Sequence, residues 1–209
     1  MAVRPIVITG EPVLHHTAAL VTDFDGALRT LVQDMYETND AANGVGLAAP
    51  QIGVGLRIYI WQMDNEDGVP IRGHVINPSV TTSRIPQERP DPEHETEGCL
   101  SVPGEAFPLK RADRAHVVGV DVDGNRVEFD ATGWFARCMQ HEYDHLNGTL
   151  YVDRLDERQS KKARKAVRRN GWGKPGHTWM PGVDADPFGH DEDEHDHDHG
   201  HAHDHEEGM

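Results

Sequence analysis

The 209-residue sequence lacks the features that define several other classes of protein. Its only cysteines are Cys99 and Cys138, too few for the disulfide framework of a small secreted scaffold. No apolar run reaches the roughly 18 residues that a membrane span needs. The first ten residues hold one arginine and the short run Ile6-Val7-Ile8, which is too short for a secretory signal. We therefore expect a cytoplasmic protein, with a monomer as the default assembly.

Cations are absent from the C-terminal end. Residues 184–209 contain eleven Asp and Glu, seven His and no Lys or Arg. This stretch carries −11 of the formal net charge of −16, which leaves −5 for residues 1–183. The body therefore has an ordinary charge that demands no nucleic-acid partner. We expect a folded domain over 1–170, a linker over 171–183 and an acidic, His-rich disordered tail over 184–209.

Periodicity and turn residues outline the elements of the body. The expected fold class is α+β, because strands come first and the helix richest in chemical groups comes late. Asp23 or Asp25 is placed to cap the first helix, and Asp123-Gly124-Asn125 is a good hairpin turn. Residues 44–53 form a Gly-rich loop and residues 84–96 an exposed one. Helices are predicted over residues 25–41, 133–147 and 156–170, and strands over 56–61, 73–78, 117–122, 126–129 and 150–152.

The pattern H-E-x-x-H occurs at His141-Glu142-Tyr143-Asp144-His145. On a helix, His141 and His145 share one face, where two imidazoles can hold one divalent metal. Glu142 lies beside the first ligand, where it can take a proton from metal-bound water. A solvent-facing helix with two incidental histidines is the plainer interpretation, since the pentapeptide also arises by chance.

Glu97-Gly98-Cys99-Leu100-Ser101 supplies a third donor, the thiolate of Cys99. One thiolate and two imidazoles leave a fourth tetrahedral position for water, which is the arrangement of a catalytic metal site. Cys99 as a buried structural thiol is the alternative, and for Cys138 we favour that alternative. A ligand thiolate also favours a reducing compartment.

Attack on a carbonyl carbon places negative charge on its oxygen, so the site needs hydrogen-bond donors there. The side-chain amide of Gln51 and the backbone N–H of Leu100 are the candidates. In isolation, Gln51 is better explained as a turn residue of the Gly-rich loop. Asp144 is expected to have a structural role.

Three motifs together resemble the peptide deformylase family. They are residues 44–51 (GVGLAAPQ), residues 97–101 (EGCLS), and residues 140–146 (QHEYDHL) with Gly148. Their order and spacing match over roughly Pro5 to Asp153. The resemblance implies antiparallel sheets around a central helix that carries HExxH. It also implies a hydrolase of protein biosynthesis that removes the formyl group from the formylmethionine of nascent polypeptides, by attack of metal-bound hydroxide.

The resemblance also implies roles for individual residues. The metal is usually Fe²⁺ in the family, with Zn²⁺ or Ni²⁺ able to replace it, and the ligands are Cys99, His141 and His145. Glu142, Gln51 and Leu100 are catalytic, and Val45 and Gly46 bind the substrate backbone. Glu97 is the family's structural carboxylate, with Arg111 as its partner.

Two departures from the family pattern stand out. Many members have an arginine several residues after the cysteine motif, but residues 102–107 read VPGEAF and no cation appears before Lys110. Arg137 occupies a helix position where an apolar pocket residue is expected. It either points elsewhere or lines the rim of the pocket.

Two alternatives and one further hypothesis remain open. A zinc peptidase of the pattern HExxHxxGxxH is the first alternative, although Tyr151 occupies its third ligand position. The second is a metal-binding module built on the His/Asp-rich residues 190–205. The whole tail, residues 184–209, is expected to buffer metal or deliver it to the Cys99 site. The hypothesis is a salt-sensitive ribosome contact through the basic stretch Lys161 to Arg169.

Overall fold

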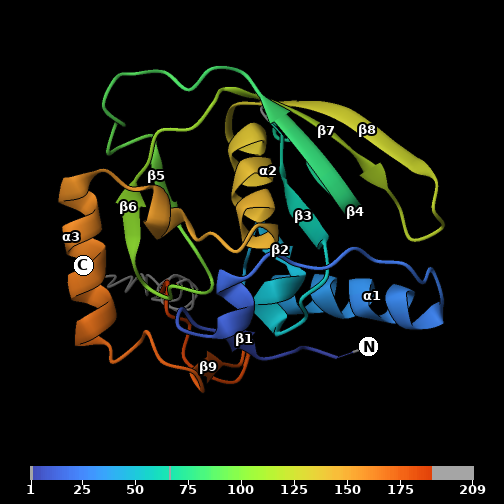
Figure 1. Ribbon diagram of the computed structural model, residues 1–209, viewed down its shortest axis with the longest axis horizontal. Helices are drawn as coiled ribbons and strands as arrows, with labels where there is room; N and C mark the ends of the chain where they lie inside the picture. Colours follow the sequence, from blue (N-terminus) through green and yellow to red (C-terminus); the bar gives the residue numbers. More distant parts are fainter. Residues whose placement is uncertain (1, 66, 190–209) are drawn as a thin grey trace, which may run out of the picture.

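A computed structural model of the chain describes residues 2–65 and 67–189. It confirms an α+β fold with antiparallel sheets. Figure 1 shows helix α2 (Gly133–Leu146) at the centre of the molecule, with the large sheet on one side and the two-stranded β5–β6 sheet on the other. Among the described residues, no helix is long and apolar enough to cross a bilayer.

The large sheet has the strand order β2-β3-β4-β7-β8. Its strands are β2 (Gly46–Ala48), β3 (Ile58–Asp64), β4 (Pro70–Thr82), β7 (Arg114–Val120) and β8 (Arg126–Thr132). The predicted hairpin turn is confirmed between β7 and β8, where Gly124 adopts φ +78°. The Asp121 carboxylate accepts hydrogen bonds from the N–H groups of Asp123 and Asn125, which fixes the turn.

Helix α2 packs across this sheet, where it contacts β2, β3, β4, β7 and β8. Ala136, Met139 and Leu146 recur at helical spacing and are fully buried in the core, so this face holds the helix in place. The helix ends before Gly148, whose φ is +69°. A β-carbon there would lie 2.7 Å from the backbone of His16, so only glycine fits.

The first predicted helix is confirmed as α1 (Gly26–Ala41). Asp25 caps it, because its carboxylate accepts hydrogen bonds from the N–H groups of Ala27 and Leu28 at 2.9 and 3.0 Å. Leu28, Val32 and Met35 bury one side of α1 in the core cluster that also contains strand β3 residues.

Two expectations for local structure were wrong. The predicted strand at 150–152 is instead a 3-10 turn, η3 (Tyr151–Arg154), because the Asp153 carboxylate accepts a hydrogen bond from the N–H of Leu150 and closes the turn. The Gly-rich loop contains strand β2 followed by the 3-10 turn η2 (Ala49–Ile52). Further 3-10 residues lie at η1 (Pro12–His15), and β5 and β6 are Thr96–Gly98 and Ala106–Pro108.

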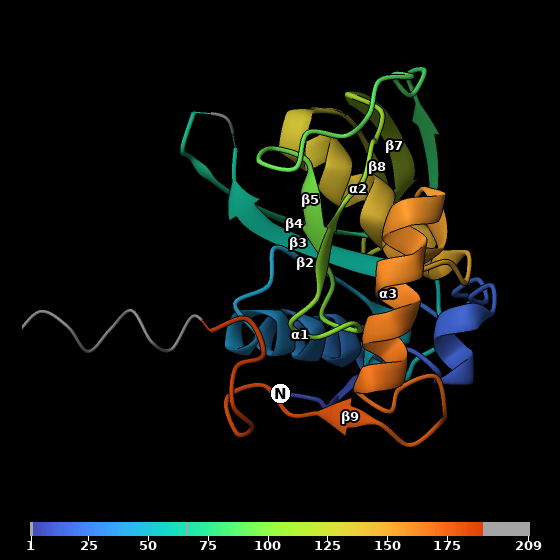
Figure 2. The same cartoon turned by 90° about the vertical axis from the view of Figure 1, so that its left-hand side faces the viewer.

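The basic helix is α3 (Glu157–Arg169), after which the chain returns along the base of the molecule (Figure 2). Residues 171–183, the expected linker, contain strand β9 (Thr178–Trp179), which pairs with β1 (Ile6–Val7). Trp179 is buried in the core, which accounts for the order of this polar stretch. Of the expected tail, residues 184–189 are described and residues 190–209 lie outside the described part of the chain.

Candidate metal centre

Cys99, His141 and His145 converge on one point. One potential ligand atom from each lies within 4.8 Å of the other two. The Cys99 Sγ and the His145 Nε2 are 3.4 Å apart. Tetrahedral coordination with bond lengths of about 2.0–2.3 Å places neighbouring ligand atoms about 3.3–3.8 Å apart. The three donors therefore fit one metal ion with a fourth position left over.

The convergence follows from local structure. The spacing of four residues on α2 brings the rings of His141 and His145 to 5.0 Å between centroids. Cys99 directly follows β5, which pairs with β6, with Glu97 opposite Phe107. The third ligand therefore comes from a separate sheet that faces the helix.

Glu97 holds the first imidazole in its orientation. Its carboxylate lies 3.1 Å from His141 Nδ1, which leaves Nε2 of that ring for a metal. Arg111 donates two hydrogen bonds to Glu97 at 2.9 Å, and Arg137 donates a third at 2.6 Å. Burial alone would raise the pKa of Glu97, but the hydrogen bonds from His141 and Arg111 outweigh it and lower that pKa. The carboxylate is therefore charged, and the expected pairing with Arg111 is confirmed.

The electrostatics of the ligands suit a cation. Burial lowers the pKa of His145 well below its usual value, so this ring is neutral and can act as a ligand. Burial would also lower the pKa of His141, but the nearby Cys99 sulfur and Glu97 raise it. The centre therefore favours positive charge. Asp144 is structural, as expected, because it binds Arg111 at 2.6 Å and Arg154 at 2.5 Å.

Glu142 lies beside the centre and outside the ligand set. Burial raises the pKa of its carboxyl group to about 7, a value suited to a group that both accepts and donates a proton near neutral pH. Its Oε2 is buried and has no hydrogen-bond partner within the described part of the chain. A buried carboxyl oxygen without a partner is a candidate for contact with substrate or water.

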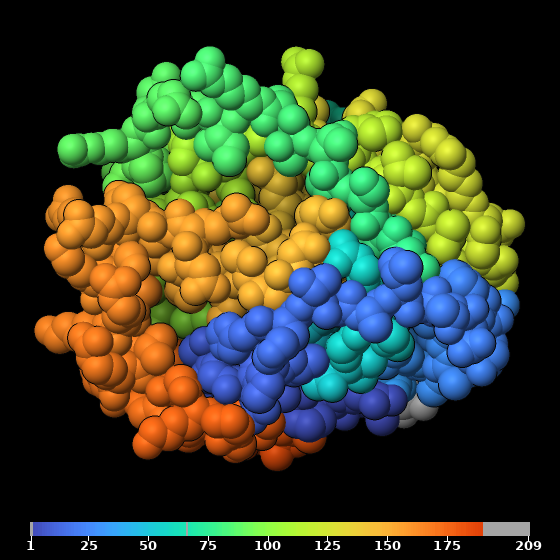
Figure 3. Space-filling view, viewed as in Figure 1, coloured from blue at the N-terminus to red at the C-terminus, as the bar shows by residue number. Residues whose placement is uncertain are grey.

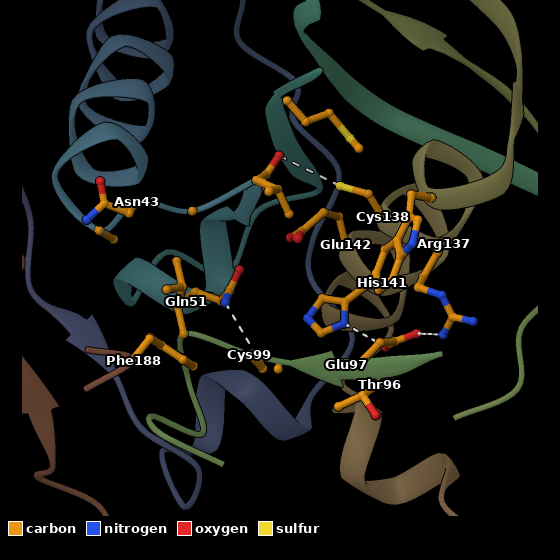
Figure 4. A pocket seen from close by; sticks show the side chains of 18 residues that line it. Asn43, Gln51, Thr96, Glu97, Cys99, Arg137, Cys138, His141, Glu142 and Phe188 are labelled. Atoms are coloured by element: carbon orange, nitrogen blue, oxygen red, sulfur yellow. Dashed lines mark hydrogen bonds and ion pairs between the residues drawn. The ribbon is translucent and has the colours of Figure 1, made fainter. Parts of the chain in front are cut away.

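Gln51 and Leu100 approach the centre from the side opposite helix α2. The N–H of Ala48 donates to Gln51 Oε1 at 2.8 Å, which turns the amide nitrogen towards Cys99 Sγ, 3.7 Å away (Figure 4). Gln51 is thus more than a turn residue, since its N–H group points into the site. The carbonyl oxygen of Leu100 accepts a hydrogen bond from Trp179 Nε1 at 2.9 Å, which fixes the backbone after Cys99.

A pocket of about 350 Å³ opens over these groups. Its lining includes all the predicted catalytic and substrate-binding residues, namely Val45, Gly46, Gln51, Leu100 and Glu142. Gly46 is closely surrounded, because a β-carbon there would lie 2.7 Å from Glu142 Oε1 and 2.9 Å from Cys138 Sγ. Cys138 is buried and its thiol points to the carbonyl of Val45, as expected for a packing residue.

Similarity to known proteins agrees with this geometry. The polypeptide deformylase family model matches residues 3–161. The peptide deformylase of Rhodococcus opacus is 50% identical over 196 residues, covering 92% of this chain and 100% of the relative. Peptide deformylase 2 of Corynebacterium efficiens is 52% identical over 192 residues, covering 91% and 100%. The crystal structure of a peptide deformylase from Legionella pneumophila is 37% identical with a TM-score of 0.70, covering 81% of this chain and 96% of that one.

The chain belongs to the peptide deformylase family. It is therefore a metallo-hydrolase with peptide deformylase activity and a Cys/His/His metal site. The peptidase alternative places a third ligand at Tyr151, but this residue is not part of the metal-site group. Its hydroxyl group donates to the carbonyl of Glu105 at 2.8 Å. The second alternative rests on residues 190–205, which lie outside the described residues.

The structure also locates pocket residues that sequence reasoning missed or left open. Arg137 lines the deformylase pocket, but its guanidinium group binds Glu97 and the carbonyl of Leu109. Lys110 pairs with Glu95 at 2.8 Å and does not line the pocket. Met63, Trp134 and Phe188 complete the apolar lining, and no motif signalled them because they are far apart in the sequence.

Proposed function

We propose that this deformylase removes the formyl group from formylmethionine at the start of nascent polypeptides. The observation that carries the proposal is the position of Glu142. It lines the same pocket as Cys99 and His141, next to the metal site and outside its ligand set. A proton-transfer group in this place is what hydrolysis of an amide such as the formyl group requires.

The donor set supports a divalent metal at Cys99, His141 and His145. When bound, the metal lowers the pKa of a water ligand towards about 7 and polarises a carbonyl oxygen. Thiolate and imidazole donors suit Fe²⁺, Zn²⁺ and Ni²⁺ alike. We propose Fe²⁺ as the native metal, because the family resemblance implies it. Metal analysis after anaerobic purification tests this identity.

Glu142 moves the proton. Its carboxylate takes a proton from the attacking water and then gives it to the nitrogen of methionine as the C–N bond breaks. Formate leaves, and the peptide keeps a free amino group. The raised pKa of Glu142 lets one group perform both transfers.

Gln51 and Leu100 stabilise the developing charge on the formyl oxygen. The Gln51 amide nitrogen is already directed to the site, and the Leu100 N–H follows the ligand Cys99. Val45 and Gly46 bind the peptide backbone. Strand β2 supports this role, because it is an edge strand of the large sheet and lines the pocket, so an extended peptide can pair with it.

The central test compares wild type with Glu142→Ala. We expect the variant to keep its metal and to lose formate release from formyl-Met-Ala-Ser. Loss of the metal together with the activity would contradict the proposed role of Glu142. Cleavage of unformylated peptides by wild type, without formate release, would favour the peptidase alternative.

We also propose a ribosome contact through α3. The helix lies at the edge of the molecule, where Figure 3 shows its surface uncovered. Only Ala163 and Ala166 of the helix are buried, and its cations face outward. Substitution of Lys162, Lys165 and Arg168 by Gln should weaken salt-sensitive co-sedimentation with ribosomes, and Arg126→Gln on β8 is the matched control. Unchanged co-sedimentation would remove this proposal.

A cytoplasmic, monomeric enzyme completes the proposal. Two buried free cysteines, one of them the thiolate ligand Cys99, fit a reducing compartment. Cell fractionation tests the location, and light scattering of the purified chain tests the assembly.

A further inference from the structure

The segment from Trp172 to Gly189, here called the C-terminal segment, lies beyond the part of the chain that the family model matches. It is held at several points along its length. Strand β9 pairs with β1, and Trp179 donates a buried hydrogen bond to the Leu100 carbonyl. The N–H of Met180 binds the Asp184 carboxylate at 2.7 Å, and the N–H of Phe188 binds Asp186 at 2.7 Å. These contacts fix the path that brings the end of the segment to the active site.

Phe188 lines the catalytic pocket together with Gln51, Cys99 and Leu100. Figure 4 shows it on the same side as Gln51, away from Arg137 and Cys138. The side chain is partly buried and packs against the core that contains Leu100. The pocket therefore has a wall that belongs to neither the metal motifs nor the matched domain.

The residues around Phe188 are small. Gly98 and Ala106 face each other in the β5–β6 pair. A β-carbon at Gly98 would lie 3.4 Å from Phe188 Cε1 and 4.0 Å from the Ala106 Cβ. Gly104 has φ +72°, and a β-carbon there would lie 2.8 Å from the Pro187 carbonyl oxygen. Small residues at all three positions create the space that the end of the C-terminal segment occupies.

The pocket wall around Phe188 is apolar, and the stretch after the cysteine motif brings no cation to it. Residues 102–107 contain no Lys or Arg, and Lys110 is paired with Glu95. The side chains of an extended peptide alternate between opposite directions. Cys138 lies across the pocket from Phe188 in Figure 4, so a peptide whose methionine side chain points to Cys138 directs its next side chain towards Phe188.

We propose that Phe188 is a specificity-determining residue that contacts the side chain immediately after formylmethionine and favours apolar and aromatic residues there. The inference rests on the proposed deformylation of formylmethionyl peptides. An aromatic or aliphatic side chain removes the exposed part of the Phe188 ring from water, whereas a carboxylate there loses hydration without gaining a partner.

The experiment uses the full-length, metal-loaded enzyme and the series formyl-Met-X-Ser, with X as Gly, Leu, Phe, Glu or Lys. We expect Phe188→Ala to lower kcat/KM about 2- to 12-fold for X = Phe and Leu, mainly through KM. The Gly peptide, which has no side chain to contact, should be unaffected. Phe188→Leu should keep most of the preference, and Val183→Ala, an exposed site in the same segment, should change nothing.

A charge exchange gives an independent outcome. Phe188→Glu should favour X = Lys over X = Glu, in contrast to the wild-type preference for apolar residues. An equal loss on every peptide, including X = Gly, would show a purely structural role and overturn the inference. A gain on every peptide with Phe188→Ala would show that the ring obstructs the site, which also overturns it. Formate release by wild type from the Gly peptide tests the proposed function separately.

Discussion

The pocket has two walls that differ in chemistry and in origin. The wall on α2 and β5 consists of ionisable groups held by buried ion pairs, with Glu97 bound to Arg111, Arg137 and His141. The wall from the C-terminal segment consists of one aromatic ring over small residues, held by the pairing of β9 with β1 and by a buried tryptophan hydrogen bond. The first wall fixes what reaction is possible. The second can vary which peptide is bound without disturbing the metal.

The largest expected effect on metal binding and activity distinguishes the two buried cysteines. Cys99→Ser should remove metal binding and lower formate release by more than about 100-fold, since loss of a mere supporting group already costs about 10- to 100-fold. Cys138→Ala should keep one metal per chain, because this thiol packs against the Val45 carbonyl. Metal analysis of both variants is the measurement. Metal loss in Cys138→Ala would remove the distinction between them.

Glu97 tests the support of the ionisable wall. Glu97→Gln removes the charge that binds His141 and two arginines, so metal affinity should fall about 10- to 100-fold. A titration against a competing chelator measures it, after thermal unfolding has shown that the variant folds. The matched control is Glu95→Gln, which loses the Lys110 pair and a longer 3.7 Å contact with Arg137 but no contact with His141. Equal affinities in the two variants would contradict the orienting role of Glu97.

Trp179 tests the anchor of the C-terminal wall. Trp179→Phe removes the hydrogen bond to the Leu100 carbonyl, and the free energy of unfolding should fall by about 0.5–1.5 kcal/mol. The N–H of Leu100 is a proposed donor to the formyl oxygen. Loss of the bond that fixes the Leu100 backbone should therefore lower kcat and change KM little. Metal content should stay the same. Trp172→Phe, in the same segment, is the control for loss of aromatic volume, and a matching loss of kcat there would reject the specific role.

His74 lies outside both walls and provides the smallest effect. Burial lowers its pKa below the usual 6.5, and its Nε2 accepts a hydrogen bond from the N–H of Val122. Below pH 6.5 the unfolded chain takes up a proton that the folded ring resists, so stability falls as the pH drops. His74→Gln should flatten this dependence, as measured by denaturant unfolding between pH 7 and pH 5. Formate release at pH 7 should be unchanged, which would separate stability from chemistry.

The sequence was most informative where function depends on local spacing. The HExxH spacing placed His141 and His145 on one face, and the Asp25 cap and the Asp123-Gly124 turn were local patterns that the structure confirms. The predicted strand at 150–152 was wrong because the hydrogen bond from the Leu150 N–H to the Asp153 carboxylate favours a turn over extended backbone. Apolar composition alone did not show this.

The remaining features depend on contacts between distant residues. Strand β2 forms inside a Gly-rich stretch because it pairs with β3, and β9 forms because β1 lies beside it. Arg137 turns to Glu97, which is 40 residues away. Phe188 reaches Gly98 from an even greater distance along the chain. Two aromatic residues in a polar C-terminal stretch, Trp172 and Trp179, are the signal of packing that the expectation of a linker overlooked.

X-ray absorption spectroscopy of the anaerobically purified, metal-loaded enzyme tests the convergence of Cys99, His141 and His145 most directly. We expect one sulfur ligand at about 2.3 Å and two imidazole nitrogens at about 2.0–2.1 Å, with the sulfur signal lost in Cys99→Ser and kept in Cys138→Ala. A metal shell without sulfur in the wild type would contradict this expectation.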